Sequence, residues 1–162
     1  MKNKKSLRQA NWQLFLFGLF KIPLIHFVRP KIIELTADKI VVRIRLKRRT
    51  KNHLNSLYFG AFAIGADLCG GFHAFWLGKK EKRKISLAFK SLNAEFLKRA
   101  ESDVYFVSEA GKSIQDMFNK SIETGERETR EIPIIAYTGY PNSKEEVAIF
   151  KIGLSIKDKG EI

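Results

Sequence analysis

One stretch of the chain constrains its fold more than any other: residues 54–78 carry a single charged side chain, that of Asp67. The length of this stretch suits a helix of about six turns. A helix that is apolar on every side is either buried inside a protein or inserted into a membrane. Asn55 or Ser56 is a suitable residue to cap the start of this helix, and Gly78 is a suitable residue to end it.

Basic runs flank the predicted helix on both sides, at residues 47–51 and 79–84. A single membrane span typically has its positive charge on one side only, and a carboxylate at mid-span costs about 3 kcal/mol on insertion scales. Both points argue against a span. We therefore expect a central helix wrapped by a sheet, in which the glycines at positions 60, 65, 70 and 71 allow close packing of the backbone.

The rest of the chain is predicted to be mostly strand. Strands are expected at residues 31–36, 39–49, 84–98, 103–109, 130–139 and 146–157, with a β-bulge near Lys90-Ser91 and a hairpin turn at residues 140–143. A short amphipathic helix is expected over residues 112–123, with Ile114, Met117, Phe118 and Ile122 at helical spacing and Gly125 closing it. This order predicts an α+β fold, in which a curved antiparallel sheet wraps around one long central helix.

Residues 5–28 begin basic and become apolar, which predicts an additional N-terminal helix of roughly 15 residues that ends near Pro23. Lys21 and Pro23 interrupt the apolar run, and no small-x-small cleavage site follows it. We therefore expect neither a signal peptide nor a membrane span. The expected location is the cytoplasm. The helix would either pack on the domain or lie at a membrane surface. Residues 1–30 are thus expected to form this helix and its lead-in, and residues 31–162 a single domain.

Lysine and arginine number 30 against 17 acidic residues, a net charge of +13, and residues 1–53 alone carry a net +12. This surplus favours an anionic partner or a solvated basic surface. Nucleic acid is the weakest of these partners, because the aromatic residues fall on apolar faces and do not alternate with the basic positions. One cysteine and three scattered histidines offer no metal-ligand spacing, so we expect no metal and no cofactor.

The segment from Asn52 to Asp67 resembles the helix-start signature of hot-dog-fold acyl-CoA thioesterases. It is similar to the phenylacetate-pathway type and to a related, uncharacterised thioesterase-like branch, which residues 27–30 and 96–100 also resemble. In these families an Asn begins a loop, a Gly-rich turn opens the helix, and an Asp follows the last Gly by seven residues. Asn52, Gly60 and Asp67 match these positions. The phenylacetate type has His-Gly-Gly where this chain has Tyr58-Phe59-Gly60.

The resemblance implies a homodimer or dimer of dimers that hydrolyses thioesters of coenzyme A or acyl carrier protein at the dimer interface. Asp67 would be the general base or the nucleophile, and the backbone N–H groups of Tyr58, Phe59 and Gly60 would bind the oxyanion. Asp67 lies about 10 Å along the helix from its start, so it would serve the start of a partner's helix. Apolar surroundings should raise the pKa of its carboxyl. A hydrogen-bonded interface Asp without a catalytic role is the alternative.

Other residues have weaker or structural interpretations. Asn52 would orient water or merely stabilise its loop, and Tyr58 fits a core aromatic better than a hydroxyl donor. Cys69 and His73 fit interior positions. Candidate substrate-binding residues are Asn55, Ser56, Lys98 and Arg99, the last two because they end the strand beside the helix. Candidate apolar lining comes from Phe59, Phe62, Phe72 and Phe75.

Three functions therefore stand as hypotheses. The first is a thioesterase that uses Asp67. The second is a protein that binds an acyl ligand without turnover. The third, less favoured, is a peripheral membrane module driven by the basic half of the chain, whose binding would collapse with salt.

Overall fold

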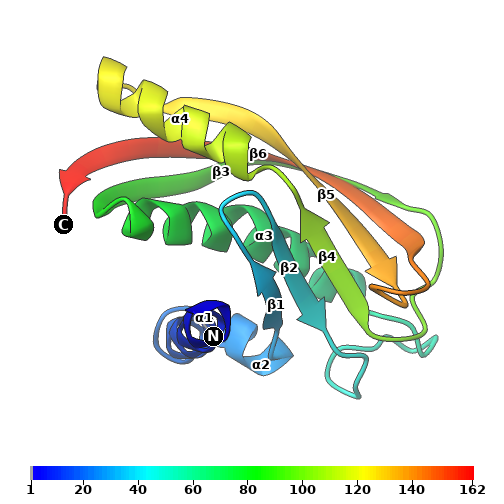
Figure 1. Cartoon of the computed structure of the whole chain (residues 1–162). Helices are drawn as coiled ribbons and strands as arrows, with labels where there is room; N and C mark the ends of the chain where they lie inside the picture. Colours follow the sequence, from blue (N-terminus) through cyan, green and yellow to red (C-terminus); the bar gives the residue numbers. More distant parts are fainter. Residues whose placement is uncertain (1) are drawn as a thin grey trace.

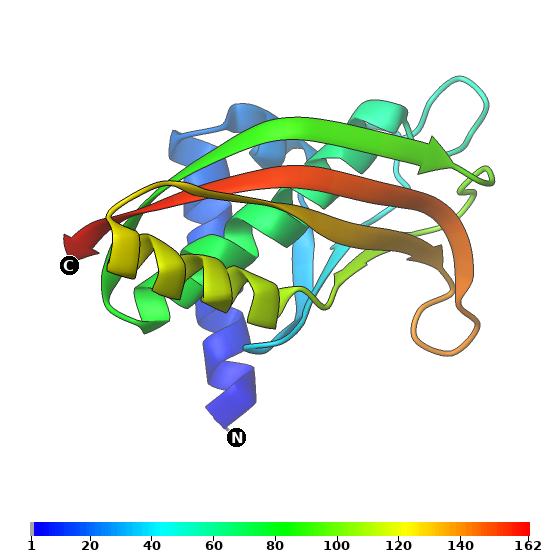
Figure 2. The same cartoon turned by 90° about the horizontal axis from the view of Figure 1, so that it is seen from above.

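The computed structural model describes residues 2–162, with side chains from Ser6 onward. The elements in chain order are α1 (Lys2–Phe20), α2 (Pro23–Val28), β1 (Lys31–Leu35), β2 (Ile40–Ile44), α3 (Phe59–Lys80), β3 (Arg83–Phe96), β4 (Val104–Ser108), α4 (Gly111–Thr124), β5 (Glu128–Thr138) and β6 (Glu145–Glu161). Figure 1 shows the sheet curving over α3, with α1 and α2 beneath α3. Helix α4 packs against β5, β6 and the C-terminal part of α3, where the Phe118 ring lies against Gly78. In the view from above, α1 crosses below α3 (Figure 2).

The strands form one antiparallel sheet in the order β1-β2-β4-β5-β6-β3. The predicted curved sheet around one long helix, with an extra N-terminal helix, is confirmed. The predicted bulge is also present, because the register of β3 against β6 shifts between Phe89 and Ser91. Strand β3 is an edge strand of 14 residues, so one side of its backbone has no neighbour among the described residues.

Helix α3 is buried on most of its surface, as its composition predicts. The backbone of Gly65 lies against the ring of Phe106, and that of Gly70 lies against the tip of Ile152, so neither position has room for a side chain. None of the helices within residues 2–162 combines the length and hydropathy that crossing a bilayer requires. The apolar stretch is therefore a core helix held under the sheet.

Both predicted ends of α3 are wrong by a few residues. The helix begins at Phe59 with Tyr58 at the N-cap, while Asn55 adopts a left-handed conformation (φ 59°) in the preceding loop and Ser56 is buried there. Neither side chain caps the helix. At the other end the helix continues through Gly78 to Lys80, and the backbone of Gly78 packs closely against the side chains of Ile85 and Phe118.

The N-terminal segment forms two helices, where one was predicted. Helix α1 ends at Phe20, and Pro23 opens the short helix α2, a position at which its missing N–H costs nothing. Helix α1 packs through Ala10 and Leu14, which are buried. Asn11 ties it to β1, because its side chain both donates to and accepts from the backbone of Ile32, each at 2.9 Å.

The predicted strand over residues 39–49 is too long, because β2 ends at Ile44. The Thr50 hydroxyl donates to the Arg45 carbonyl oxygen at 2.6 Å and accepts from the Lys47 N–H at 2.9 Å, which turns the chain away from the sheet. The predicted short helix is confirmed as α4, and Gly125 closes it in a left-handed conformation. Ile122 is 44% exposed, so it does not belong to the buried face.

Candidate functional site

A cavity of about 640 Å³ lies between α1, α3 and β3. Helix α1 supplies Phe17 and Phe20, α3 supplies Phe72 and Phe75, and β3 supplies Phe89 among its lining side chains. We call it the α1–α3 pocket. A largely apolar pocket of this size with a few polar groups is typical of a site for a small apolar ligand.

Asp67 supplies the carboxylate of the α1–α3 pocket. Its side chain is half-buried, and no hydrogen bond or ion pair joins it to another described residue. Burial alone raises the pKa of the Asp67 carboxyl from its ordinary value of 3.8 to about 6. Gly71, one turn further along, leaves space beside it, because a Cβ there would lie 3.4 Å from Asp67 Oδ1 and 2.9 Å from the Phe89 ring.

A second, smaller cavity of about 370 Å³ lies at the start of α3, and we call it the helix-start pocket. It brings together six residues that the sequence singles out as candidates: Asn52, Ser56, Phe59, Phe62, Lys98 and Arg99. Phe62 and Phe96 complete its apolar wall. The structure therefore places the candidate residues in two groups, with Asp67 in one pocket and most of the others in the second.

The start of α3 presents two backbone donors. The N–H groups of Phe59 and Gly60 donate to no acceptor among the described residues, as expected at a helix N-terminus. The N–H of Tyr58 donates to the Thr50 carbonyl oxygen at 2.8 Å, so it is not a third oxyanion donor. Tyr58 is also no core aromatic, since it is 51% exposed and its ring lies over Gly60.

Asn52 holds the loop before α3 in place. Its side-chain oxygen accepts hydrogen bonds from the N–H of Leu54 at 2.9 Å and from both the N–H and the hydroxyl of Ser56 at 3.2 Å. This geometry fits the loop-stabilising interpretation of Asn52. Asn55 points elsewhere, because its side-chain oxygen accepts from the Lys51 ammonium at 2.8 Å and it does not line either pocket.

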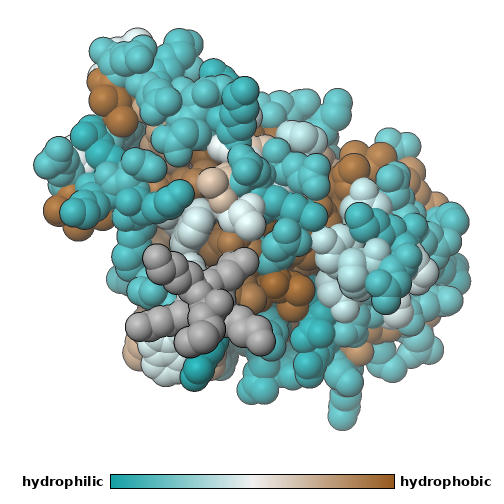
Figure 3. All heavy atoms as spheres, in the orientation of Figure 1, coloured by the Kyte–Doolittle hydropathy of each residue, from teal (hydrophilic) through white to brown (hydrophobic). Residues whose placement is uncertain are grey.

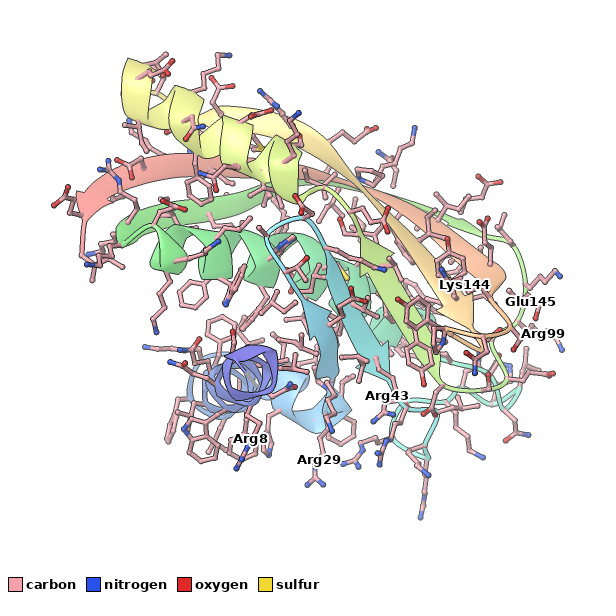
Figure 4. All side chains as sticks on the ribbon, viewed as in Figure 1. Arg8, Arg29, Arg43, Arg99, Lys144 and Glu145 are labelled. Atoms are coloured by element: carbon pink, nitrogen blue, oxygen red, sulfur yellow. The ribbon has the colours of Figure 1, made fainter. Side chains whose placement is uncertain are left out.

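Two cations border the helix-start pocket. The Lys98 ammonium lies 2.6 Å from a carboxylate oxygen of Glu145, which neutralises much of its charge. Arg99 forms no ion pair with a described residue. Figure 4 shows Arg99 at the same end of the molecule as Lys144 and Glu145. Arg99 is therefore the cation at this pocket that keeps its charge for an anionic ligand.

Two further residues have interior positions. Cys69 is fully buried, its thiol donates to the Phe106 carbonyl oxygen at 3.3 Å, and burial raises the pKa of that thiol. His73 is also fully buried, with Nε2 2.9 Å from the Thr36 carbonyl oxygen, and burial lowers the pKa of its imidazole. Within the described part of the chain, no cluster of three or more His, Cys, Asp or Glu side chains has metal-binding geometry.

The sequence matches one family model, over residues 11–156, which covers most of the chain. The chain belongs to the DUF4442 family, a domain of unknown function. No curated protein matches the sequence. Membership of DUF4442 thus defines relatives without defining a reaction.

Several solved structures have a fold similar to that of the DUF4442 chain. A protein of unknown function from Chlorobaculum tepidum superposes with a TM-score of 0.79 at 12% identity, covering 93% of this chain and 96% of that one. A thioesterase from Haemophilus influenzae has a TM-score of 0.65 at 17% identity, with 88% of each chain covered. A mutant thioesterase from Pseudomonas aeruginosa has a TM-score of 0.67 at 16% identity, with 94% of each chain covered. The fold is that of thioesterase-like hot-dog proteins.

The sequence did not reveal that α1 forms one wall of the pocket around Asp67. Phe17 and Phe20 of α1 face a cavity whose other walls lie more than 40 residues away in the chain. The sequence feature that could have indicated this wall is the number of aromatic residues in the N-terminal run. It is larger than the number that one buried face of a helix can accommodate.

Proposed function

We propose that this protein hydrolyses acyl thioesters of coenzyme A or acyl carrier protein. The observation that carries the proposal is the Asp67 carboxylate, which lies in the wall of a large apolar pocket without a partner among the described residues. A half-buried carboxylate without a partner costs folding free energy, so a functional role would explain why the chain carries one here. A pKa raised to about 6 suits a general base that works near neutral pH.

In this mechanism Asp67 takes a proton from a water molecule as the water oxygen attacks the thioester carbonyl carbon. The carbonyl oxygen becomes an oxyanion, which the N–H groups of Phe59 and Gly60 stabilise together with the positive end of the helix dipole. The tetrahedral intermediate then collapses and the C–S bond breaks. Protonated Asp67 returns its proton to the departing sulfur, so that a carboxylic acid and a thiol are released and the Asp67 carboxylate is regenerated. Direct attack by the carboxylate, through an anhydride that water hydrolyses, is the alternative use of the same residue.

Asp67 and the helix start of one chain lie about 10 Å apart along α3, too far to act on one carbonyl group. They share a face, because Gly60, Asp67 and Gly71 follow one another at helical spacing on the least buried stripe of α3. We infer that an antiparallel second copy covers this stripe, as in the phenylacetate-type thioesterases that residues 52–67 resemble. Asp67 of one chain would then meet the helix start of the other.

The edge strand β3 supports such a dimer. Phe89, Leu92 and Phe96 are 41%, 50% and 50% exposed. Leu92 pairs directly with Ile152, which faces α3, so the Leu92 side chain also projects from the concave face of the sheet. A long apolar edge strand promotes pairing with another chain. A second copy that pairs its β3 here would bury these side chains and continue the sheet.

The two pockets suit the two ends of an acyl thioester. The apolar α1–α3 pocket would hold the acyl group, and the helix-start pocket would hold the carrier end, where Arg99 is suited to a phosphate. Ser56 and Asn52 would shape the loop of the helix-start pocket. Lys98, already paired with Glu145, would contribute less.

A thiol-release assay over a chain-length series of acyl-CoA substrates tests the proposal. Asp67→Asn should lower kcat/KM by at least about 100-fold for each substrate that the wild type cleaves, because general-base catalysis contributes factors of this size. Asp116→Asn is the matched control, since Asp116 is an exposed carboxylate on α4. Full hydrolysis by Asp67→Asn would overturn the mechanism.

A second function, binding of an acyl ligand without turnover, is favoured by one observation. The oxygen of Asn52 is fully engaged in its own loop, so it is not available to hold a water molecule. Titration calorimetry beside the thiol-release assay separates the two functions. Tight binding of an acyl-CoA with no release of thiol would establish the binder.

A further inference from the structure

The outer surface of α1 and α2 exposes large apolar side chains that the fold does not use. Trp12 is 60% exposed, Leu24 60% and Phe27 55%, with Phe15 and Leu19 also exposed. Trp12 and Phe15 stack with ring centroids 5.5 Å apart. We call this set of five residues the α1–α2 surface. Apolar side chains gathered in this way, unlike single exposed ones, mark an interaction site.

The packing of these helices does not require the α1–α2 surface. Helix α1 docks through Ala10 and Leu14, and α2 docks through Ile25 and Val28, all of them buried. Most of the face seen in Figure 3 is hydrophilic. The exposed apolar side chains of β3 lie on the edge strand that is proposed to pair with a second copy, so they have a role of their own. The residues of the α1–α2 surface therefore face outward for a reason other than folding.

The sequence that forms the α1–α2 surface carries only positive charge. Residues 1–33 contain no aspartate or glutamate, and their basic residues are Lys2, Lys4, Lys5, Arg8, Lys21, Arg29 and Lys31. Arg8 lies one helical turn from Trp12 on the same face of α1. Arg8 and Arg29 project from the lower side of the molecule beneath α1 and α2, with Arg43 further along that side (Figure 4).

We propose that the α1–α2 surface docks on an anionic lipid membrane, lying in the interface without crossing it. Aromatic and leucine side chains with cations beside them are the composition of helices that bind in the plane of a membrane. Anionic lipids attract each cation near the surface, and Trp fits the headgroup region. A second copy of this chain fits less well, because a symmetric contact would place like charges of both copies opposite one another.

Sedimentation with vesicles tests the proposal, comparing phosphatidylcholine alone with phosphatidylcholine containing phosphatidylglycerol. The protein should bind only the anionic vesicles, and binding should fall steeply with salt. Arg8→Glu/Arg29→Glu should weaken the partition about fivefold or more for each charge. Trp12→Ala/Phe15→Ala should weaken it at fixed charge. Lys144→Glu and Ile122→Asp, exposed sites on other faces, are the matched controls and should bind as the wild type does.

Fluorescence gives a second readout, because Trp12 and Trp76 are the two tryptophans. In Trp76→Phe, the emission of Trp12 should shift to the blue on anionic vesicles, whereas Trp12→Phe should show no shift. Asp67→Asn should bind vesicles like the wild type, which separates this proposal from the proposed hydrolysis. Failure to bind anionic vesicles at low salt overturns the proposal, as does dissociation of an oligomer by Trp12→Ala/Phe15→Ala.

Discussion

At the scale of single residues, the ionisation of Asp67 works against folding. Its pKa is raised from 3.8 to about 6 in the folded chain, so the folded state binds the proton more tightly than the unfolded state. The stability contribution of this group is therefore complete below pH 4 and is lost as the pH rises through 6. The loss amounts to about 3 kcal/mol, from the size of the shift.

Asp67→Asn should consequently be the more stable protein at pH 8, by up to about 3 kcal/mol, although it is the less active one. The advantage should shrink as the pH falls and vanish near pH 4, where the wild-type carboxyl is protonated too. Urea unfolding of both proteins across this range measures the difference. A constant difference at all pH values would show that the carboxyl is not desolvated.

The two cations at the helix-start pocket should differ in their effect on binding. Arg99→Ala should raise KM for an acyl-CoA about tenfold, because a charge-assisted hydrogen bond to phosphate is lost. Lys98→Ala should have a smaller effect, since Glu145 already pairs with that ammonium. Steady-state kinetics with both variants measures the two changes in KM. Equal changes would contradict the expectation that the ion pair with Glu145 makes Lys98 the less important cation.

At the scale of elements, the close contact of α3 with the sheet makes its glycines differ in how much stability a substitution by alanine should cost. Gly65→Ala should destabilise the protein, because overpacking against the buried Phe106 ring costs about 1–3 kcal/mol and exceeds the gain in helix propensity of up to about 1 kcal/mol. Gly70→Ala meets only the flexible tip of Ile152 and should cost less. Denaturant unfolding of both variants tests the order. The reverse order would mean that the ring of Phe106 moves aside easily.

The elements themselves could be predicted from local pattern, but their ends could not. The composition of α3, the phase slip of β3 and the closing glycine of α4 are local signals, and each led to the observed element. The start of α3 depends on the loop that Asn52 holds, and the end of β2 depends on the hydrogen bonds of Thr50. These side-chain hydrogen bonds compete with the backbone hydrogen bonds that would extend the helix or the strand. The spacing of residues in the sequence does not reveal which hydrogen bonds form.

The candidate site was predictable only in part for a related reason. The start of α3 and Asp67 are visible in the sequence because they share one helix. The contribution of α1 depends on the bonds between Asn11 and Ile32, contacts between segments that lie 21 residues apart. A wall built by such long-range docking leaves no spacing pattern.

At the scale of the whole molecule, the proposed dimer depends on the edge strand β3. Leu92→Lys should convert it to a monomer, because it places a charge among the exposed apolar side chains of this edge. Hydrolysis should be lost with the dimer while the circular dichroism spectrum is unchanged. Ile122→Lys, a comparably exposed site on α4, is the control and should remain dimeric in sedimentation experiments. An active Leu92→Lys monomer would refute the shared site.

Mixing two inactive variants tests directly whether each site draws on both chains. Phe59→Pro removes one of the two N–H donors, and proline is well tolerated at the first position of a helix. Asp67→Asn lacks the carboxylate but keeps its helix start. In a mixed dimer, Asp67 of the first variant meets the intact helix start of the second, so one of the two sites is whole. Random exchange of subunits should then restore about a quarter of wild-type activity, since about half of the dimers are mixed and each holds one whole site. A site contained within one chain would give no recovery, because neither variant holds both groups.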